Sequence, residues 1–191
     1  MAPIILFSSG KGSNVQAILD YFRNSDKVNI ALIVCNVLNA GVLDIAQKEN
    51  IPVLMVNNRL DFKNGLFVEK LMGINPQLIV LAGFLWKLPS NVVDQFAGKI
   101  INIHPALLPK YGGKGMYGKR VHEAVIAAGE KESGITIHEV NEKYDDGAPL
   151  LQVKLDIEAG ETAESLAKRI HELEHYYLPK TIEFLIDQKK Q

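Results

Sequence analysis

The chain has 191 residues, of which 47% are hydrophobic and 23% charged, and its formal net charge is -1. This length suits one α/β domain with a full core, and the weak net charge without a dense Lys/Arg stripe argues against a nucleic-acid-binding protein. A single cysteine, Cys35, excludes an internal disulfide and fits a reducing compartment, so we expect a cytoplasmic protein. No apolar run reaches membrane-spanning length.

Short β-branched runs alternate with stretches of helical periodicity through the first hundred residues. The expected strands are Ile4–Phe7, Val28–Val34, Val53–Val56, Leu78–Leu81 and Ile100–Ile103, and the helices between them include Val15–Phe22, Val42–Lys48 and Phe62–Met72. Strands that alternate with helices connect through right-handed crossovers into a mainly parallel sheet with helices on both faces. The sequence therefore predicts a Rossmann-like α/β fold.

The pattern changes after this point. A long loop at 105–118 leads to another helix and then to Gly134–His138 and Leu150–Leu155, which alternate as half-buried strands do. The last helix begins near Ala163, and its apolar face is expected to pack back onto the sheet.

The first strand ends in Ser9-Gly10-Lys11-Gly12-Ser13-Asn14 and opens directly into a helix. Backbone N–H groups and the positive end of the helix dipole converge there, which favours an anion site, most simply a phosphate. The spacing fits neither a Walker A loop nor a complete dinucleotide fingerprint. The alternative is a tight turn in which Ser13 or Asn14 merely caps the helix.

A second candidate site lies in Asn102-Ile103-His104-Pro105, at the carboxyl end of the fifth strand. Ligands of open α/β sheets bind at that edge, and the period of two places Asn102 and His104 on one side of the strand. Taken alone, a histidine at a strand end is more often a structural hydrogen-bonding residue.

A third element is the turn Tyr144-Asp145-Asp146-Gly147. A carboxylate beside an imidazole orients the ring and favours its cation. Asp-Gly turns are common on protein surfaces, however, and either Asp145 or Asp146 could be the active carboxylate.

Together these groups suit acyl transfer to an amine. Asn102 and a protonated His104 would donate hydrogen bonds to the oxyanion of the tetrahedral intermediate, and Asp145 would hold His104 and take part in the proton transfer. Cys35 lies in an expected strand and is interpreted as a core residue.

At these residues the chain resembles the glycinamide ribonucleotide formyltransferases, a folate-dependent family of purine synthesis. The similarity runs from the first strand to the last helix, and it rests on the glycine loop, Leu81-Ala82-Gly83-Phe84, Asn102-Ile103-His104-Pro105-Ala106-Leu107-Leu108-Pro109, Asp145-Asp146-Gly147 and Glu174-His175. The resemblance implies transfer of the formyl group of 10-formyltetrahydrofolate to the amine of glycinamide ribonucleotide, without a metal.

By the same resemblance each part of the site acquires a role. The substrate phosphate would be bound by Gly12, Ser13 and Asn14, and the ribonucleotide would also contact Glu174. The catalytic group would be Asn102, His104 and Asp145. The folate would be bound by Asn102, by the segment Leu85, Trp86, Lys87 and Leu88, and through its tail by Lys63.

The expected functions divide the chain into two halves. We expect one formyltransferase domain over 1–191, with a phosphate-binding half at about 1–100 and a catalytic and folate-binding half at about 101–191. The segment Gly112–Gly118 has more glycines than better-known members of the family, and it is interpreted either as a mobile lid or as a connection without catalytic duty. The oligomeric state is left open.

Two neighbouring activities share the expected fold. A methionyl-tRNA formyltransferase would use the same Asn, His and Asp on the same folate, but that family usually appends a second, basic domain, whereas this chain ends after the last helix. A deformylase would resemble this chain with an additional N-terminal regulatory domain.

An alternative of a different class is a zinc hydrolase, because His171-Glu172-Leu173-Glu174-His175 matches the His-Glu-x-x-His pattern of metalloproteases. Few residues remain after it to supply a third ligand, and the family resemblance already accounts for Glu174. A last alternative is a catalytically silent nucleotide-binding module.

Overall fold

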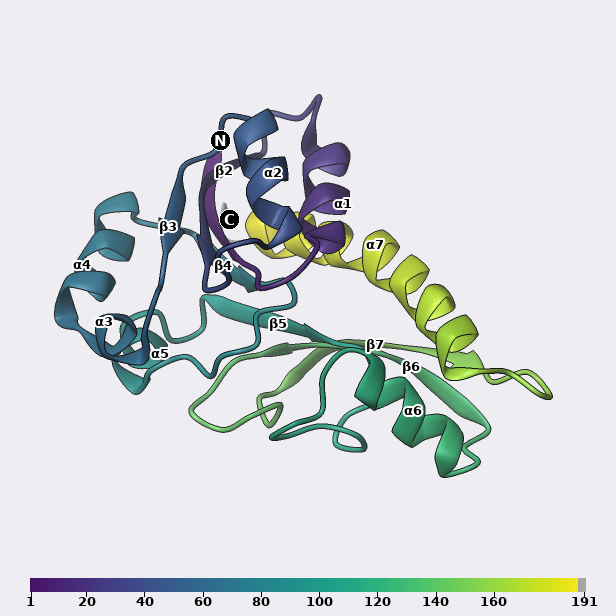
Figure 1. Ribbon diagram of the computed structural model, residues 1–191. Coiled ribbons are helices and arrows are strands. Elements are labelled where there is room, and N and C mark those ends of the chain that lie inside the picture. The colour runs from purple at the N-terminus through teal and green to yellow at the C-terminus, as the bar shows by residue number, and fades with distance from the viewer. Residues whose placement is uncertain (189–191) are drawn as a thin grey trace.

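The computed structural model describes residues 1–188, which contain one seven-stranded sheet in the order β3-β2-β1-β4-β5-β6-β7 (Figure 1). Neighbouring strands in the first five positions are parallel. Their bounds are β1 (Ala2–Phe7), β2 (Val28–Cys35), β3 (Val53–Met55), β4 (Leu78–Leu81) and β5 (Ile100–His104). These parallel pairings confirm the expected mainly parallel sheet. A helical segment lies between each two consecutive strands, as a parallel crossover requires.

The other two strands, β6 (Glu132–Glu139) and β7 (Pro149–Asp156), join the sheet antiparallel. Exposure alternates along β7, as expected for a strand with one solvated face. The same expectation is wrong for β6, which is buried on both faces from Ser133 to His138. A helix covers one face, while Thr136 on the other face hydrogen-bonds the loop that follows β5.

Helices cover both faces of the sheet. The core of one face includes side chains of α1 (Ser13–Phe22), α2 (Gly41–Lys48), α6 (Lys119–Ala127) and α7 (Ala163–Gln188). The core of the other face includes side chains of α3 (Arg59–Lys63), α4 (Gly65–Ile74) and α5 (Ser90–Gln95). In Figure 1 the long helix α7 runs past α1 and α2 on their side of the sheet, so the C-terminal helix packs back as expected.

The expected helix Phe62–Met72 is instead two helices, α3 and α4, that meet at Asn64. The backbone of Asn64 is extended, and its side-chain oxygen accepts a hydrogen bond from the N–H of Leu66. Asparagine is a strong helix N-cap, so it starts a new helix here and overrides the helical periodicity of the flanking residues. The short helix α5 had no counterpart in the sequence-based prediction.

None of the helices within residues 1–188 combines the length and the apolarity needed to cross a membrane. The strands β1 and β5 both pair with β4 and run in the same direction, so their carboxyl ends lie at one edge of the sheet. Ile101 and Ile103 of β5 enter the core beside α7, which turns Asn102 and His104 to the opposite side. This arrangement brings the glycine loop and the Asn-x-His segment to one edge.

Candidate active site

The glycine loop ends at Gly12, which is the N-cap of α1 and lies in the left-handed region at φ 80°. A Cβ there would come within 2.8 Å of the Ile45 side chain and 3.0 Å of the Val42 backbone, so the position requires glycine for both conformation and space. No side chain caps α1. The first N–H groups of the helix are therefore available to an anion, and the alternative of a helix cap formed by Ser13 or Asn14 is not what the structure has.

Asn14 connects this loop to the last helix. Its Nδ2 donates to Oε2 of Glu174 at 3.1 Å, across 160 positions of sequence, and both side chains are buried. Burial raises the pKa of Glu174 to about 7, because an ionised carboxylate loses hydration there and the hydrogen bond from Asn14 compensates only in part. The Oδ1 atom of Asn14 is buried without a hydrogen-bond partner.

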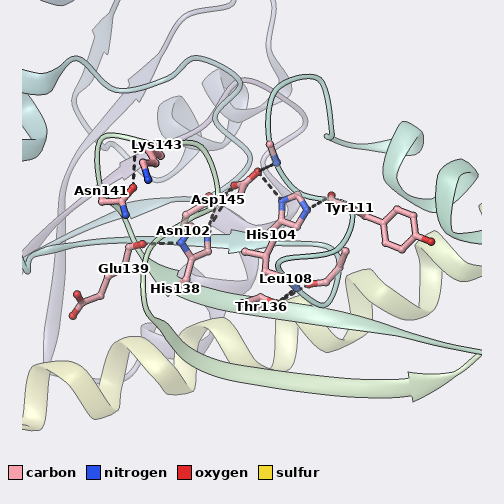
Figure 2. Close-up of polar contacts among 12 residues, drawn as sticks. Asn102, His104, Leu108, Tyr111, Thr136, His138, Glu139, Asn141, Lys143 and Asp145 are labelled. Atoms are coloured by element: carbon pink, nitrogen blue, oxygen red, sulfur yellow. Dashed lines mark hydrogen bonds and ion pairs between the residues drawn. The ribbon is translucent and has the colours of Figure 1, made fainter. Parts of the chain in front are cut away.

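The catalytic group expected from the sequence converges at the edge of the sheet (Figure 2). The Nδ2 of Asn102 lies 3.4 Å from Oδ1 of Asp145, and the Nδ1 of His104 lies 3.6 Å from its Oδ2. His104 is only 4% exposed. An amide, an imidazole and a carboxylate thus face one another, although Asp145 comes from a turn far away in the sequence.

The turn that carries Asp145 is shaped by its own residues. Asp145 lies in the left-handed region at φ 51°, which Asp tolerates better than most residues. A Cβ on Gly147 would overlap the carbonyl oxygen of Glu139, so glycine is needed for the turn to close against β6. Asp146 is exposed and pairs with Lys143, which leaves Asp145 as the carboxylate beside His104.

Burial decides the charge of His104. Loss of hydration lowers the pKa of its imidazole below the usual 6.5, although the Asp145 carboxylate and the carbonyl of Tyr111 oppose the shift. The lowered pKa favours the neutral ring at pH 7 in the free protein. The sequence leaves this resting state open, because a protonated His104 is expected there only as a donor during the reaction. Its Nε2 lies 2.8 Å from the carbonyl oxygen of Tyr111, a contact that requires the proton on Nε2 and leaves Nδ1 as a free acceptor facing Asp145.

The Asp145 carboxylate stays ionised. Burial alone would raise its pKa, but the neighbouring imidazoles of His138 and His104 and the hydrogen bond from the backbone N–H of Gly113 outweigh burial and lower the pKa below the ordinary value. The Gly113 N–H donates to Oδ2 at 2.8 Å. The glycine-rich segment Gly112–Gly118 is therefore part of the site at its first residues, and the neighbouring Gly112 has no room for a side chain against Leu108 and Asp145.

A fourth side chain, His138, belongs to this cluster and was missed in the sequence. It stands directly opposite Asn102 in the β5–β6 pairing, and its Nε2 lies 3.1 Å from Asn102 Nδ2 and 3.7 Å from Asp145 Oδ1. Its Nδ1 lies 2.7 Å from the Glu139 carbonyl oxygen, so Nδ1 carries the proton and Nε2 accepts from the amide. The alternation of side chains along β6 could have predicted that His138 lies on the same face of the sheet as His104. It could not have predicted that His138 contacts Asn102.

The residues expected to bind a folate lie beside a cluster of aromatic rings. Trp86 packs against Phe62, with the guanidinium of Arg59 5.0 Å from the centre of the indole. The N–H of Leu85 donates to Ser9, which ties this segment to the glycine loop. Leu88 is buried in the core beside α5.

The two basic candidates in this region have different surroundings. Lys87 lies with its ammonium 5.8 Å from the centre of the Tyr144 ring, next to the turn that carries Asp145. Lys63 ends α3, and its carbonyl oxygen accepts a hydrogen bond from Asn91. No described contact ties the Lys63 ammonium to the catalytic group, whereas Arg59 faces Trp86 directly.

The His-Glu-x-x-His sequence falls inside α7, where the rings of His171 and His175 stack with centroids 6.2 Å apart. Within residues 1–188 no cluster of three or more His, Cys, Asp or Glu side chains has the arrangement of a metal site. Glu174, between the two histidines, is held by Asn14 of the glycine loop.

Comparison with known proteins identifies the family. Residues 2–182 match the model of the formyl transferases. The chain belongs to this family.

Several relatives are close to this chain in length. The phosphoribosylglycinamide formyltransferases of Haemophilus influenzae and Bacillus subtilis are 36% and 33% identical, over 98% and 97% of this chain and 88% and 95% of their own. The solved phosphoribosylglycinamide formyltransferase of Coxiella burnetii superposes with a TM-score of 0.88 at 35% identity, covering 98% of this chain and 88% of the other. The Coxiella burnetii protein therefore has the same α/β fold as this chain.

Other relatives are longer. This chain spans 61% of the chloroplastic phosphoribosylglycinamide formyltransferase of Vigna unguiculata, to which it is 36% identical over 97% of its own length. It spans 14% of the trifunctional purine biosynthetic protein of Drosophila melanogaster, at 34% identity over 96% of its own length. The formyl transferase fold therefore occurs both alone and within larger proteins.

Proposed function

We propose that this protein transfers the formyl group of 10-formyltetrahydrofolate to the amine of glycinamide ribonucleotide, as residues 1–191 acting as one catalytic unit in the cytoplasm. The observation that carries the proposal is the convergence of Asn102, His104 and Asp145 at the same sheet edge as an uncapped helix N-terminus. A phosphate held at the N-terminus of α1 would leave the rest of the substrate free to extend toward the catalytic group. The full-length relatives named as phosphoribosylglycinamide formyltransferases support the same substrates.

The phosphate would be bound by the N–H groups of Gly12, Ser13 and Asn14. Glu174 would accept a hydrogen bond from a hydroxyl of the ribose. Its carboxyl group is hydrogen-bonded to Asn14, next to the proposed phosphate site, and it can accept a hydrogen bond whether it is protonated or ionised. The buried, unpartnered Oδ1 of Asn14 offers a further acceptor at this place. This end of the site therefore binds an anion with a polyhydroxylated group next to it.

The folate would lie against the aromatic segment. Leu85, Trp86 and Lys87 are outside any helix or strand, so backbone groups other than the N–H of Leu85, which donates to Ser9, can pair with the edge of a flat heterocycle. Trp86, which packs on the buried Phe62, offers an apolar wall. Leu88 anchors the segment in the core. The basic residue for the folate tail would be Lys63 or, from its position over Trp86, Arg59.

In the proposed reaction the amine attacks the formyl carbon directly. Nδ1 of neutral His104 accepts the proton that the amine loses, and the Asp145 carboxylate 3.6 Å away stabilises the resulting imidazolium. When the tetrahedral intermediate collapses, the bond between the formyl carbon and the folate nitrogen breaks, and the imidazolium gives its proton to that nitrogen, which releases tetrahydrofolate. Asn102 donates to the oxyanion with the N–H that makes only a long, 3.4 Å contact to Asp145. His138 accepts the other amide hydrogen and so fixes which way Asn102 points.

The test is an acceptor comparison. The purified protein is incubated with 10-formyltetrahydrofolate and, separately, glycinamide ribonucleotide, methionyl-tRNA or no acceptor, and the deformylated folate and the formylated acceptor are measured. We expect product only with the ribonucleotide. Product with methionyl-tRNA, or release of formate without acceptor, would assign one of the neighbouring activities instead.

The same assay separates the remaining alternatives. Dialysis against a chelator is expected to leave the turnover unchanged, because the proposed chemistry uses only Asn102, His104 and Asp145. Activity that is lost on dialysis and restored by Zn²⁺ would support the His171-Glu172 pattern as a metal site. Turnover that His104→Ala abolishes would reject a silent nucleotide-binding module.

A further inference from the structure

The loop that follows β5 contacts both members of the His104–Asp145 pair. The carbonyl oxygen of Tyr111 lies 2.8 Å from Nε2 of His104, and two residues later the N–H of Gly113 donates to Oδ2 of Asp145 at 2.8 Å. Both contacts come from the loop backbone, and Figure 2 shows the ring of Tyr111 pointing away from His104. The conformation of this loop therefore determines which nitrogen of the imidazole carries the proton.

The backbone of Tyr111 has an unusual conformation. Its φ is 56°, in the left-handed region that bulky residues rarely adopt. Glycine adopts this region without a steric penalty, and the same loop has a glycine at its next left-handed position, Gly113, where φ is 91°. A tyrosine in such a conformation persists only where surrounding contacts hold it. The side chain of Tyr111 is therefore expected to make a contact that offsets the strain.

That contact is a hydrogen bond to Glu130, which follows α6. The Tyr111 hydroxyl donates to Oε1 of Glu130 at 2.9 Å, and Nζ of Lys110 donates to the same oxygen at 2.9 Å. The hydrogen bonds from Lys110 and Tyr111 lower the pKa of Glu130, so the acceptor is ionised. The ring of Tyr111 packs against the core on the α7 side of the sheet. The ring and the hydroxyl together fix the side chain.

The two ends of this turn are fixed by other contacts. The N–H of Leu108 donates to Oγ1 of Thr136 at 3.0 Å, and the carbonyl oxygen of Leu108 accepts from Nε2 of Gln152 at 2.8 Å. Gly113 is fixed by the hydrogen bond described above. Tyr111, between these two attachment points, is held through its side chain. Loss of the hydroxyl contact would therefore loosen the carbonyl group that faces the imidazole.

We propose that Tyr111 and Glu130 are positioning residues for the imidazole of His104, an inference that rests on the proposed formyl transfer. The hydrogen bond between them holds the left-handed backbone of Tyr111, and the carbonyl oxygen of that residue keeps the His104 proton on Nε2. Nδ1 then stays free to accept the proton of the amine. In the other tautomer Nδ1 carries the proton and donates to Asp145, so the ring has no free acceptor on the side of the reaction.

The first test measures the tautomer of His104 by nitrogen NMR of the free protein with isotope-labelled histidine. The His104 signals are assigned by their absence in His104→Gln, and in the unmodified protein we expect an unprotonated Nδ1 and a protonated Nε2. Tyr111→Phe and Glu130→Ala each remove the hydrogen bond, and each should raise the population of the other tautomer about fivefold, a typical effect of one lost hydrogen bond. Unchanged His104 shifts in either variant, shown by thermal unfolding to be folded, would overturn the proposal.

Two further variants separate the hydrogen bond from the charge of Glu130. Glu130→Gln retains an oxygen that accepts from the Tyr111 hydroxyl, so it is expected to keep the tautomer of the unmodified protein. Lys110→Met is the matched control, because it breaks the ion pair with the same carboxylate and leaves the hydroxyl contact in place. A change in Lys110→Met as large as that in Tyr111→Phe would contradict the proposal. So would a Glu130→Gln variant that behaves like Glu130→Ala.

The kinetic effect follows from the same geometry. Tyr111→Phe is expected to lower the kcat of formyl transfer about tenfold, because a small displacement of a catalytic group costs turnover. The KM of both substrates should stay within about twofold, since the proposed substrate contacts lie elsewhere. An unchanged kcat, or a change confined to KM, would overturn the positioning role. The tautomer measurement requires no turnover, so its failure is distinct from failure of the proposed formyl transfer.

Discussion

Replacing Asp145 with Asn removes the charge beside His104 and little else. The 3.6 Å separation between His104 Nδ1 and Asp145 Oδ2 corresponds to an attraction of about 5 kcal/mol between full charges at an effective dielectric constant of about 20. If half to all of the imidazolium charge has formed in the transition state, this attraction increases the turnover rate by a factor of roughly 10² to 10³. We therefore expect Asp145→Asn to lower kcat by that factor.

The fold should survive this substitution. The asparagine oxygen can still accept the hydrogen bond from Gly113, and the neighbouring His104 is neutral, so no unpaired charge is buried. The Asp145 pKa is lowered in the fold, so its ionised form stabilises the protein above its unfolded pKa, and this contribution is lost in the variant. We expect a loss of about 1–2 kcal/mol, or roughly 2–8 °C in Tm.

The assay measures formyl transfer at saturating substrates, together with thermal unfolding. Asp146→Asn is the matched control, since it neutralises the next residue, which is exposed and contacts only Lys143 and Asn141 among the described side chains. Turnover of Asp145→Asn within tenfold of the unmodified protein would refute the electrostatic role. An equal loss of turnover in Asp146→Asn would show that the net charge of the turn matters, and not the place of the Asp145 carboxylate beside His104.

Three further predictions concern the same site. The pKa of Glu174 in the folded protein is about 7, above its unfolded value, so the stability that its neutral form contributes is complete below about pH 4.5 and is lost as the pH rises through 7. Glu174→Gln should therefore raise Tm at pH 8 by roughly 4–12 °C and remove the dependence of Tm on pH that this residue causes between about pH 4.5 and 7. Calorimetry should show weaker binding of the ribonucleotide to the same variant. Because the pKa of His104 is lowered, kcat/KM should be flat near pH 7 and fall only below pH 6.5, and a profile that already falls between pH 8 and 7 would contradict a neutral base. His138→Phe keeps a ring of similar shape but leaves Asn102 without its acceptor, so kcat should fall roughly 10- to 100-fold with little change in KM, and a change in KM alone would indicate a binding role instead.

Sequence alone determined the local parts of this protein. The bounds of all seven strands were predicted to within two residues. Strands buried on both faces are short apolar runs, and strands buried on one face alternate apolar and polar residues, so both kinds can be recognised in the sequence. The same period placed Asn102 and His104 on one side of β5. Local signals failed where one residue overrode its neighbours, as at Asn64, which caps α4 and divides an expected helix.

Tertiary structure decided which distant groups meet and what charge they carry. His138 reaches Asn102 only because β6 pairs antiparallel with β5 in one register, and Asn14 reaches Glu174 only because α7 packs beside α1. The neutrality of His104 depends on burial, which no motif records, since the same imidazole in solvent beside Asp145 would have a raised pKa. The residue types and their order follow from the sequence, whereas distances and hydration exist only once the chain has folded.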